Sequence, residues 1–239
     1  MTLPNCYRVG YFSGGVSSAV AIKIVCDELD KIVYTHIDDQ HPDTMRFIRD
    51  CETWFGKPVT IMQSPFKSVD NVCRFTSFIR SPAGAVCTRI LKREVRKEFE
   101  RNTAVLSVVW GLDCTETERA DRIRTAMPNH SHRFPLIDER MTKADAHKAL
   151  RASGIKRPAM YDLGYHNNNC IGCVKGGMGY WNKIRIDFPD VFASRSKLER
   201  DIGFSILSRS WLDELDPERG RHAGPVCEDC GIFCELIAL

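Results

Sequence analysis

The first part of the chain alternates short stretches of β-branched and aromatic residues with longer stretches in which apolar residues recur every three or four positions. The first pattern is typical of strands and the second of amphipathic helices. Together they predict strands at residues 7–12, 31–37, 59–62 and 104–110, and helices at residues 17–29, 43–55 and 88–101. This alternation indicates an α/β fold of the Rossmann-like, doubly wound type with a mostly parallel sheet.

The pattern changes in the second part of the chain. Residues 142–152 form a predicted helix that opens with Thr142 and Asp145, spaced as in a capping box. Beyond Pro158 the chain is rich in Gly and Asn, residues 181–204 have a helical pattern broken at Pro189, and the end is rich in cysteine. We therefore expect one domain at residues 1–158 and a cysteine-rich C-terminal extension at residues 159–239 packed on it.

Composition narrows the class of protein. Of the 239 residues, 43% are hydrophobic, which is enough for a sizeable core. No apolar run reaches the roughly 20 residues that a membrane span needs, and residues 1–6 do not resemble a secretory signal. We expect a cytoplasmic protein without membrane contact. The formal net charge of +3 permits a nucleic-acid partner without indicating one.

A segment rich in serine and glycine, Ser13-Gly14-Gly15-Val16-Ser17-Ser18, separates the first predicted strand from the first predicted helix. Glycines let backbone N–H groups face one point, the helix N-terminus adds partial positive charge, and hydroxyls add donors. The result is a cradle suited to a pyrophosphate. The segment matches neither the Walker loop nor the dinucleotide fingerprint. A glycine-rich turn with a serine cap is the alternative.

The cysteines are numerous for a reducing compartment, where a disulfide framework is not expected. Cys170 and Cys173 are spaced to reach one metal or cluster, and flanking glycines leave room for inorganic sulfide. Cys87 precedes a predicted helix whose N-terminus favours a thiolate. An iron–sulfur cluster, a structural zinc ion and plain buried thiols remain open. A second group near the C-terminus comprises Cys227, Cys230 and Cys234, whereas packing thiols are expected at Cys6, Cys26, Cys51, Cys73 and Cys114.

Charged residues follow several of these elements. Arg89, Lys92 and Arg119 are cations of the kind that a phosphate-handling site requires, although a solvated helix face is the alternative for each. Glu116 is a candidate to orient an arginine or to hold Mg²⁺, and Asp38 is a second candidate for Mg²⁺. For His130 and His132 we expect a polar surface loop rather than a metal site.

Taken together, these segments resemble the adenine nucleotide α-hydrolases with a pyrophosphate loop, and within them the phosphoadenosine phosphosulfate reductase-like branch. That branch contains sulfonucleotide reductases and the ATP pyrophosphatases of DNA phosphorothioation systems. The resemblance spans about residues 7–190. Its matching segments are Ser13 to Ser18, His36-Ile37-Asp38, Pro42-Asp43-Thr44 to Phe47, Cys87 to Lys92, Gly111 to Arg119, and Cys170-Ile171-Gly172-Cys173.

The resemblance implies an adenine nucleotide α-hydrolase-like fold in which residues 1–158 bind the nucleotide. The phosphates of ATP or of a sulfonucleotide would lie on Ser13, Gly14, Gly15, Val16, Ser17 and Ser18, and the adenine near Ile37 and Asp38. Many members carry Asp where this chain has Ser17, so the Mg²⁺ contact differs at this position. The implied catalytic residues are Ser17, Ser18, Arg89, Lys92, Glu116 and Arg119.

The resemblance also implies a [4Fe–4S] cluster bound by the thiolates of Cys87, Cys170 and Cys173. The last two make residues 159–239 a cluster-binding C-terminal region. Thr88 stands where cluster-bearing sulfonucleotide reductases have a second adjacent cysteine. The fourth ligand is therefore expected from the C-terminal group, and we choose Cys230 over Cys227 and Cys234.

The function expected from the resemblance is an ATP pyrophosphatase that uses ATP, Mg²⁺ and the cluster to activate a nucleic-acid acceptor for sulfur incorporation. A cysteine desulfurase or another sulfur donor is the expected partner. One alternative is a sulfonucleotide reductase with Cys230 as nucleophile, because Cys230-Gly231-Ile232 resembles the Cys-Gly-Ile/Leu-His motif of those enzymes, although Phe233 replaces the histidine. The other alternative is a nucleotide-binding, redox-sensing module.

Overall fold

The structure, a computed structural model, describes residues 6–81, 84–207 and 210–221. The chain divides into two compact units that interleave in the sequence. The first unit comprises Met1–His36, Pro42–Met62 and Val95–Gly164, and the second comprises Ile37–His41, Gln63–Glu94 and Tyr165–Leu239. Each unit is described by itself below. The boundary expected near residue 158 stays a prediction.

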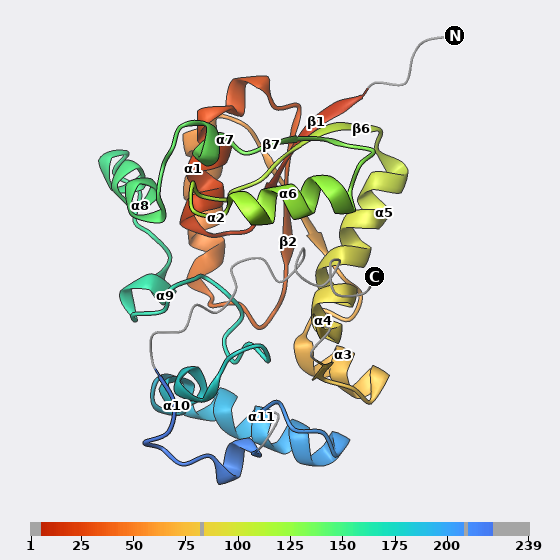
Figure 1. Cartoon of the computed structure of the whole chain (residues 1–239), viewed down its shortest axis with the longest axis vertical. Coiled ribbons are helices and arrows are strands. Elements are labelled where there is room, and N and C mark those ends of the chain that lie inside the picture. Colours follow the sequence, from red (N-terminus) through yellow and green to blue (C-terminus); the bar gives the residue numbers. More distant parts are fainter. Residues whose placement is uncertain (1–5, 82–83, 208–209, 222–239) are drawn as a thin grey trace. The chain divides into compact units, whose positions relative to one another are not determined.

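The first unit is built on a five-stranded sheet with the strand order β3-β2-β1-β6-β7 (Figure 1). Its strands are β1 (Tyr7–Phe12), β2 (Lys31–His36), β3 (Val59–Gln63), β6 (Val105–Val109) and β7 (Ser131–Arg133). The pairs β1–β2, β1–β6 and β6–β7 are parallel. The predicted Rossmann-like, doubly wound α/β fold is thereby confirmed. The strand order reverses between β1 and β6, and folds of this type bind ligands at such a reversal.

Helices of the first unit follow the strands. They are α1 (Val16–Ile24), α2 (Asp43–Phe55), α5 (Glu94–Asn102), α6 (Thr117–Ala126), α7 (Pro135–Asp138), α8 (Lys143–Ala152), α9 (Ala159–Asp162) and the 3-10 turn η1 (Cys26–Glu28). The predicted capping box of α8 is confirmed, because Thr142 and Asp145 exchange side-chain-to-backbone bonds. Helix α2 coincides with its predicted range, and it ends where Gly56 adopts the left-handed conformation with φ 67°.

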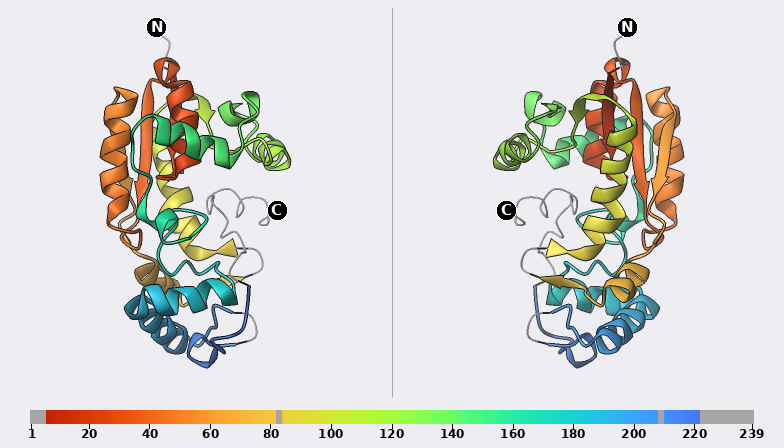
Figure 2. Two further views of the ribbon diagram at one scale, coloured as in Figure 1. Left: turned by 90° about the vertical axis from the view of Figure 1, so that its left-hand side faces the viewer. Right: turned by 90° about the vertical axis from the view of Figure 1, so that its right-hand side faces the viewer.

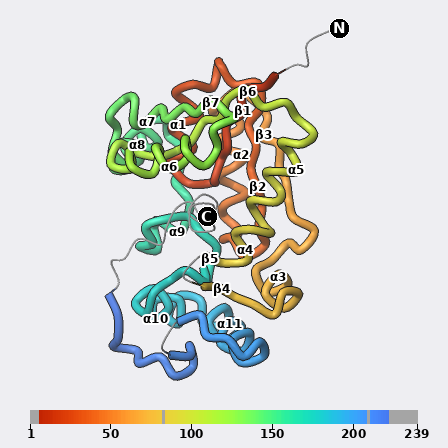
Figure 3. The backbone as a smooth tube through the Cα atoms, turned by 45° about the vertical axis from the view of Figure 1, so that its right-hand side comes forward, coloured from red at the N-terminus to blue at the C-terminus, as the bar shows by residue number. Residues whose placement is uncertain are grey.

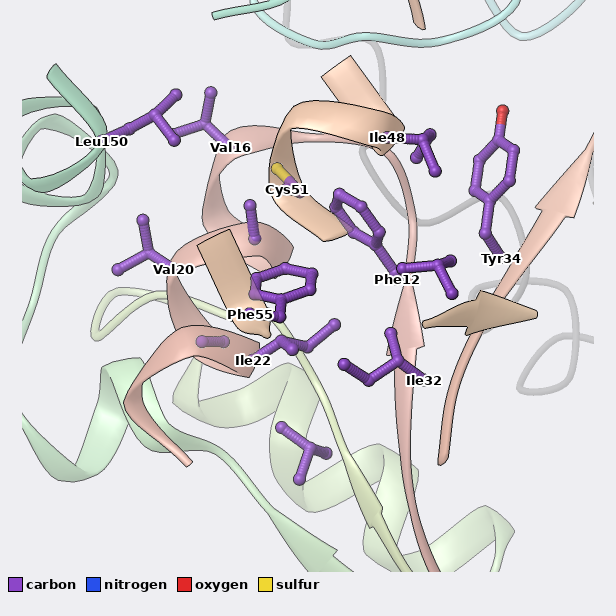
Figure 4. Close-up of a cluster of buried hydrophobic side chains, with 14 of the residues drawn as sticks. Phe12, Val16, Val20, Ile22, Ile32, Tyr34, Ile48, Cys51, Phe55 and Leu150 are labelled. Atoms are coloured by element: carbon purple, nitrogen blue, oxygen red, sulfur yellow. The ribbon is translucent and has the colours of Figure 1, made fainter. Parts of the chain in front are cut away.

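The core of the first unit lies around β1, α1 and α2 (Figure 4). Helix α2 buries Phe47, Ile48, Cys51 and Phe55, which recur at helical spacing on one face. Phe12 of β1 packs edge-on against Phe55, with ring centroids 5.6 Å apart. Full burial of a side chain such as Phe47 contributes about 1.5–3 kcal/mol. This core fixes where β1 ends and where α1 begins.

The second unit is mostly helical. Its elements are α3 (Val69–Thr76), β4 (Arg80–Ser81), β5 (Gly84–Ala85), α4 (Val86–Thr88), the π-helical turn η2 (Arg89–Arg93), α10 (Met178–Asp187), α11 (Pro189–Ile202) and the 3-10 turn η3 (Leu212–Glu214). Helices α10 and α11 pack against each other, and α3 packs on α11 (Figure 2). Pro189 is the first residue of α11, which explains the predicted break at that residue.

Some predictions were wrong in detail. The helix expected at residues 88–101 begins at Val86 and contains the π-helical turn η2. Figure 3 shows the course of the chain from β3 through α3 and α4 into α5. Strand β6, predicted at residues 104–110, exposes 54% of Leu106. A register shift between Tyr7 and Arg8 in the β1–β6 pair accounts for this exposure.

The sequence patterns missed α3 and α6. None of the helices within the described ranges is long and apolar enough to cross a membrane.

Candidate functional site

The loop after β1 is shaped by its two glycines. Gly14 has φ 79°, a left-handed conformation that side chains rarely adopt, and a Cβ there would lie 3.2 Å from atoms of both Thr44 and Tyr34. Gly15 is the N-cap residue of α1 and provides no side-chain cap. The positive end of the helix dipole therefore faces this loop without a capping side chain from Gly15.

Two serine hydroxyls hold the loop closed. The Ser18 hydroxyl donates to the Gly15 carbonyl over 2.9 Å and accepts from the Ser13 amide over 3.2 Å. The Ser13 and Ser18 hydroxyl oxygens are 2.8 Å apart. Because the proton of Ser18 is already donated to Gly15, Ser13 is the donor in this last bond. These bonds hold the loop in its curved form through its own side chains.

Ser17 differs from the other two serines. Its side chain is 4% exposed, and its hydroxyl makes no hydrogen bond to any residue that the structure describes. A buried hydroxyl without a partner is costly, and such groups are commonly found where a ligand completes the bonding. In the first turn of α1, an oxyanion is the ligand that a hydroxyl and helix amides would both favour.

A tyrosine that the sequence patterns did not single out reaches the same helix end. Val16 donates its amide proton to the hydroxyl of Tyr161 over 3.3 Å, and Tyr161 comes from α9. The ring of His147 packs edge-on against Tyr161, with centroids 4.7 Å apart. Burial lowers the pKa of His147 to about 4, so the imidazole is neutral near pH 7. No short-range signal in the sequence connects Tyr161 to the loop.

The chain leaving β6 approaches the first turn of α1 closely. A Cβ on Gly111 would lie 2.4 Å from the Cα of Ser18, so only glycine fits at this position. The segment after β6 and the loop after β1 therefore meet at the reversal of strand order. This close approach explains why residue 111, the first residue of the segment 111–119, is a glycine.

Glu116 and Arg119 form an ion pair beyond this glycine. The guanidinium of Arg119 lies 2.5 Å from a carboxylate oxygen of Glu116, and Arg119 is 6% exposed. The other carboxylate oxygen of Glu116 accepts from the amide of Asp113 over 3.1 Å. Glu116 therefore orients Arg119, which is one of the two roles expected for it. Whether the pair acts on a phosphate stays a prediction.

The predicted residues at the end of β2 belong to the second unit. Ile37 is buried, whereas Asp38 is exposed and accepts a hydrogen bond from the side-chain amide of Gln63 over 2.6 Å. The neighbouring Asp39 forms a buried ion pair with Arg195 of α11. Their roles toward adenine and Mg²⁺ stay predictions.

Three of the four predicted metal ligands line one cavity in the second unit, which we call the thiol pocket. Cys87, Cys170 and Cys173 share its lining with Thr88, Lys92 and Asn169, and apolar side chains complete it. The fourth predicted ligand, Cys230, lies outside the described residues, as do Cys227 and Cys234. Cys87 lies inside the first helical turn, rather than before it. Arg89 is exposed.

The lining brings three thiols and apolar surface together, and the metal group expected there stays a prediction. No three His, Cys, Asp or Glu side chains in the described ranges are grouped closely enough to hold a single metal ion. The cavity measures about 20 Å³, a volume that holds about one water molecule. A cluster therefore requires the lining to move apart.

Tyr180 organises the Cys-x-x-Cys turn. Its hydroxyl accepts from the amide of Cys173 over 2.9 Å and donates to the carbonyl of Cys170 over 3.2 Å. Burial raises the pKa of Tyr180 well above its ordinary value, so the hydroxyl keeps the proton that it donates. A Cβ on Gly176 would lie 1.9 Å from the Tyr180 ring, which explains glycine there.

A second set of bonds attaches the turn to the segment after β2. The carbonyl of Asp39 accepts from the amide of Ile171 over 2.8 Å, and Gln40 forms a β-bridge with Cys170. The Asp39 carboxylate also accepts from the amide of Val69 over 2.7 Å, at the start of α3. Three separate segments of the second unit thus meet at the cysteine turn.

Other candidates have structural roles. Burial raises the pKa of Cys73 to about 12 and that of Cys51 further, as expected of packing thiols that stay protonated. His132 lies in strand β7 rather than in a surface loop. Its Nδ1 accepts from Trp110 over 3.0 Å and its Nε2 donates to the Met127 carbonyl over 2.8 Å. Burial lowers the pKa of His132, so it is neutral.

Comparison with protein-family models and with curated proteins found no match. Among solved structures, the fold is similar to that of a phosphoadenylyl-sulfate (PAPS) reductase from Candida auris, determined as a phosphate complex. The TM-score is 0.50 at 13% sequence identity, and the match covers 71% of this chain and 82% of that chain. At this identity the likeness shows the fold alone, and the chain has a PAPS reductase-like fold.

Proposed function

We propose that this protein is an ATP pyrophosphatase that cleaves ATP to AMP and pyrophosphate and so adenylates an acceptor for sulfur incorporation. The observation that carries the proposal is the loop after β1, in which Ser13 and Ser18 hold the curve and Ser17 presents a buried hydroxyl without a described partner. Its position beside the reversal of strand order supports the same reading.

The chemistry follows from where charge develops. When an acceptor oxygen attacks the α-phosphorus, the bond to the oxygen that bridges to the β-phosphate breaks, and the pyrophosphate leaves with added negative charge. The AMP group stays on the acceptor until the sulfur nucleophile displaces it, and where water attacks in place of the acceptor, AMP is released directly. The positive end of the α1 dipole and the Ser17 hydroxyl stabilise the charge of the leaving pyrophosphate. Arg119, oriented by Glu116, is a further cation of the first unit. Arg89 and Lys92, which belong to the second unit, stay predicted catalytic residues.

Mg²⁺ supplies charge neutralisation to the phosphates in such reactions. Glu116 is paired with Arg119, and Asp38, which belongs to the second unit, stays the second carboxylate predicted for the ion. An exposed carboxylate is suited to Mg²⁺, which keeps several of its water ligands.

In the thiol pocket we assign Cys87, Cys170 and Cys173 to a [4Fe–4S] cluster, with Cys230 as the fourth ligand. The three thiols line one cavity, and thiolates are the usual ligands of such clusters. Such a cluster binds or relays sulfur. A cysteine desulfurase or another sulfur donor is then the partner, and a nucleic acid is the acceptor.

A sulfonucleotide reductase is the second candidate. It is favoured by Cys230-Gly231-Ile232 near the C-terminus and by the PAPS reductase-like fold. In that case Cys230 attacks the sulfate sulfur as a nucleophile and cannot also serve as the fourth ligand. The two candidates differ in their substrate, so a direct assay distinguishes them.

The test uses anaerobically purified full-length chain with Mg²⁺ and either ATP or PAPS plus reduced thioredoxin. We expect AMP and pyrophosphate from ATP and no sulfite from PAPS. Sulfite without pyrophosphate would replace the proposal by the reductase. Tight ATP binding without either product would indicate the redox-sensing module.

A pair of serine variants tests the loop itself. Ser17→Ala should lower kcat/KM for ATP by about 10²–10³, the usual effect of removing one donor to a developing negative charge. Its thermal stability should not fall, because the hydroxyl has no described partner to lose. Ser194→Ala, an exposed serine on α11, is the matched control. Equal kcat/KM for both variants would contradict the assigned role of Ser17.

A further inference from the structure

One segment of the first unit holds the net positive charge of the chain. Residues 139–162, which include α8 and α9, carry six lysine and arginine side chains and three carboxylates. Their balance of +3 equals the formal net charge of all 239 residues, so the rest of the chain is neutral by the same count. The six cations are Arg140, Lys143, Lys148, Arg151, Lys156 and Arg157. Charge gathered in this way is suited to an anionic partner.

Helix α8 arranges part of this charge along one side. Its buried residues Ala146 and Leu150 belong to the core cluster that also contains residues of α1, and the two helices pack against each other (Figure 1). Lys143, His147 and Arg151 recur every four residues, which places them one above another on the same side of α8. From Lys143 to Arg151 the helix is about 12 Å long.

Three positive charges converge on the His147 imidazole. Burial is the main cause of its low pKa of about 4, and the charges of Arg157, Lys143 and Arg151 lower this pKa further. Arg157 lies in the segment before α9, and its guanidinium pairs with Asp162 over 2.6 Å. Both side chains of that pair are exposed, and exposed pairs are weak, so the pair leaves Arg157 able to bind a second anion. We call Lys143, Arg151 and Arg157 the cationic face.

The cationic face adjoins the loop after β1. The Lys143 ammonium lies 5.8 Å from the centre of the Tyr161 ring, and His147 packs on the same ring. The Tyr161 hydroxyl in turn accepts from the amide of Val16, the first residue of α1. One aromatic ring therefore connects the cations to the proposed nucleotide site, and all these residues belong to the first unit.

We propose that the cationic face binds the phosphate backbone of the nucleic acid that accepts the adenylate. The role of that nucleic acid as acceptor rests on the proposed function, whereas its binding to this face does not. A length of about 12 Å corresponds to about three phosphates of one DNA strand along the duplex axis, and it exceeds the triphosphate group of a single nucleotide. Lysine and arginine contacts to phosphates position a nucleic acid without reading its sequence.

The first test measures binding of a fluorescein-labelled DNA duplex to the full-length chain by anisotropy at several salt concentrations, without ATP. Arg151→Gln should weaken binding and reduce the slope of log affinity against log salt by about 0.9, the value of one phosphate contact. Arg151→Lys, which keeps the charge, should retain the slope. Lys197→Gln removes the same charge from an exposed lysine of α11 and is the matched control. Equal slopes in Arg151→Gln and Lys197→Gln would contradict the inference.

A second test locates the bound DNA through His147. Phosphates beside the three cations offset their positive charge, so DNA should raise the pKa of His147, which NMR of the imidazole follows as pH is varied. If DNA binds and this pKa does not move, the DNA binds elsewhere and the inference is wrong. If inorganic triphosphate raises the pKa as much as DNA does, the face binds the phosphates of the nucleotide instead, which also overturns the inference.

These outcomes are separate from those of the ATP assay. A chain that releases pyrophosphate from ATP but fails both binding tests retains the proposed function and loses the cationic face as a nucleic-acid site. A chain that passes both binding tests but releases no pyrophosphate retains the nucleic-acid site, and the proposed function fails.

Discussion

The loop after β1 and the thiol pocket achieve their shapes in different ways. In the loop, the shaping residues are close neighbours in the sequence, and Ser13, Gly15 and Ser18 bond to one another. In the thiol pocket, Cys87 and Cys170 come from distant parts of the chain. The backbone of the cysteine turn is held by hydrogen bonds to the Tyr180 hydroxyl and to the Asp39 carbonyl.

This difference shows why the whole loop is recognisable as one short motif, whereas only the Cys-x-x-Cys turn of the thiol pocket is. A phosphate cradle needs successive amides and hydroxyls on one turn, which a short segment can supply. A cluster needs thiols from several directions, so the chain must return to the same place more than once. The following variants test whether the two regions are also separate in function.

The largest effect is expected from removing a cysteine. Cys170→Ser should abolish iron binding, because the turn loses one of its two thiolates, while pyrophosphate release from ATP should be unchanged. Iron content and the ATP assay measure both effects on one preparation. Cys6→Ser, at an exposed cysteine, is the control. If ATP cleavage disappears together with the iron, the two regions are not separate and the comparison fails.

The next effect belongs to the loop. Gly111→Ala places a Cβ against the backbone of Ser18, so the first turn of α1 must shift. A displacement of about 1 Å in an active site can cost about 10²-fold in rate, and we expect at least that loss in kcat/KM for ATP. Overpacking should also cost about 1–3 kcal/mol of stability.

Gly177→Ala is the matched control for this substitution, because a Cβ at Gly177 meets no atom within 4 Å. It should retain both ATP cleavage and iron binding. A Gly111→Ala chain with full activity would show that the close approach of residue 111 to α1 does not shape the loop.

A smaller effect is expected from Tyr180→Phe. The variant keeps the ring but leaves the Cys173 amide without its acceptor, which costs about 1–3 kcal/mol when the amide is buried. The cysteine turn should loosen, so iron should be lost faster to a chelator. Tyr165→Phe, which removes a bond to Asp187 instead, is the comparison. Equal rates of iron loss in the two variants would contradict a positioning role for Tyr180.

The smallest effect concerns pH and the loop region. Burial holds the pKa of His147 at about 4, below the unfolded value of about 6.5. The unfolded chain therefore binds more protons between these values, and stability falls as pH drops from about 6.5 to about 4. Allowing for partial exposure, the loss is on the order of 1 kcal/mol. In denaturant unfolding, the free energy of unfolding of His147→Gln should depend less on pH across this window than that of the wild type. An unchanged dependence would show that other groups cause it.

Much of the fold was predictable because local patterns and packing agreed. Strand β1 and helix α2 have their predicted ranges, since alternating and helical apolar spacing both end at clear signals such as Gly56. Helix α6 was missed because its face carries Arg119 in a buried position, which polarity alone assigns to the surface. The π-helical turn at Arg89–Arg93 leaves no trace in residue spacing.

The candidate site divides in the same way. The sequence by itself determined the serine-glycine loop, the Glu116–Arg119 spacing and the Cys-x-x-Cys turn, because each is a contact between residues a few positions apart. Only the tertiary structure decided that Tyr161 bonds to α1, that Gly111 must lack a side chain, and that Thr88 shares a cavity with three thiols. The physical reason is that burial and the pairing of a donor with its acceptor depend on chain segments that are distant in sequence and meet only in the folded state.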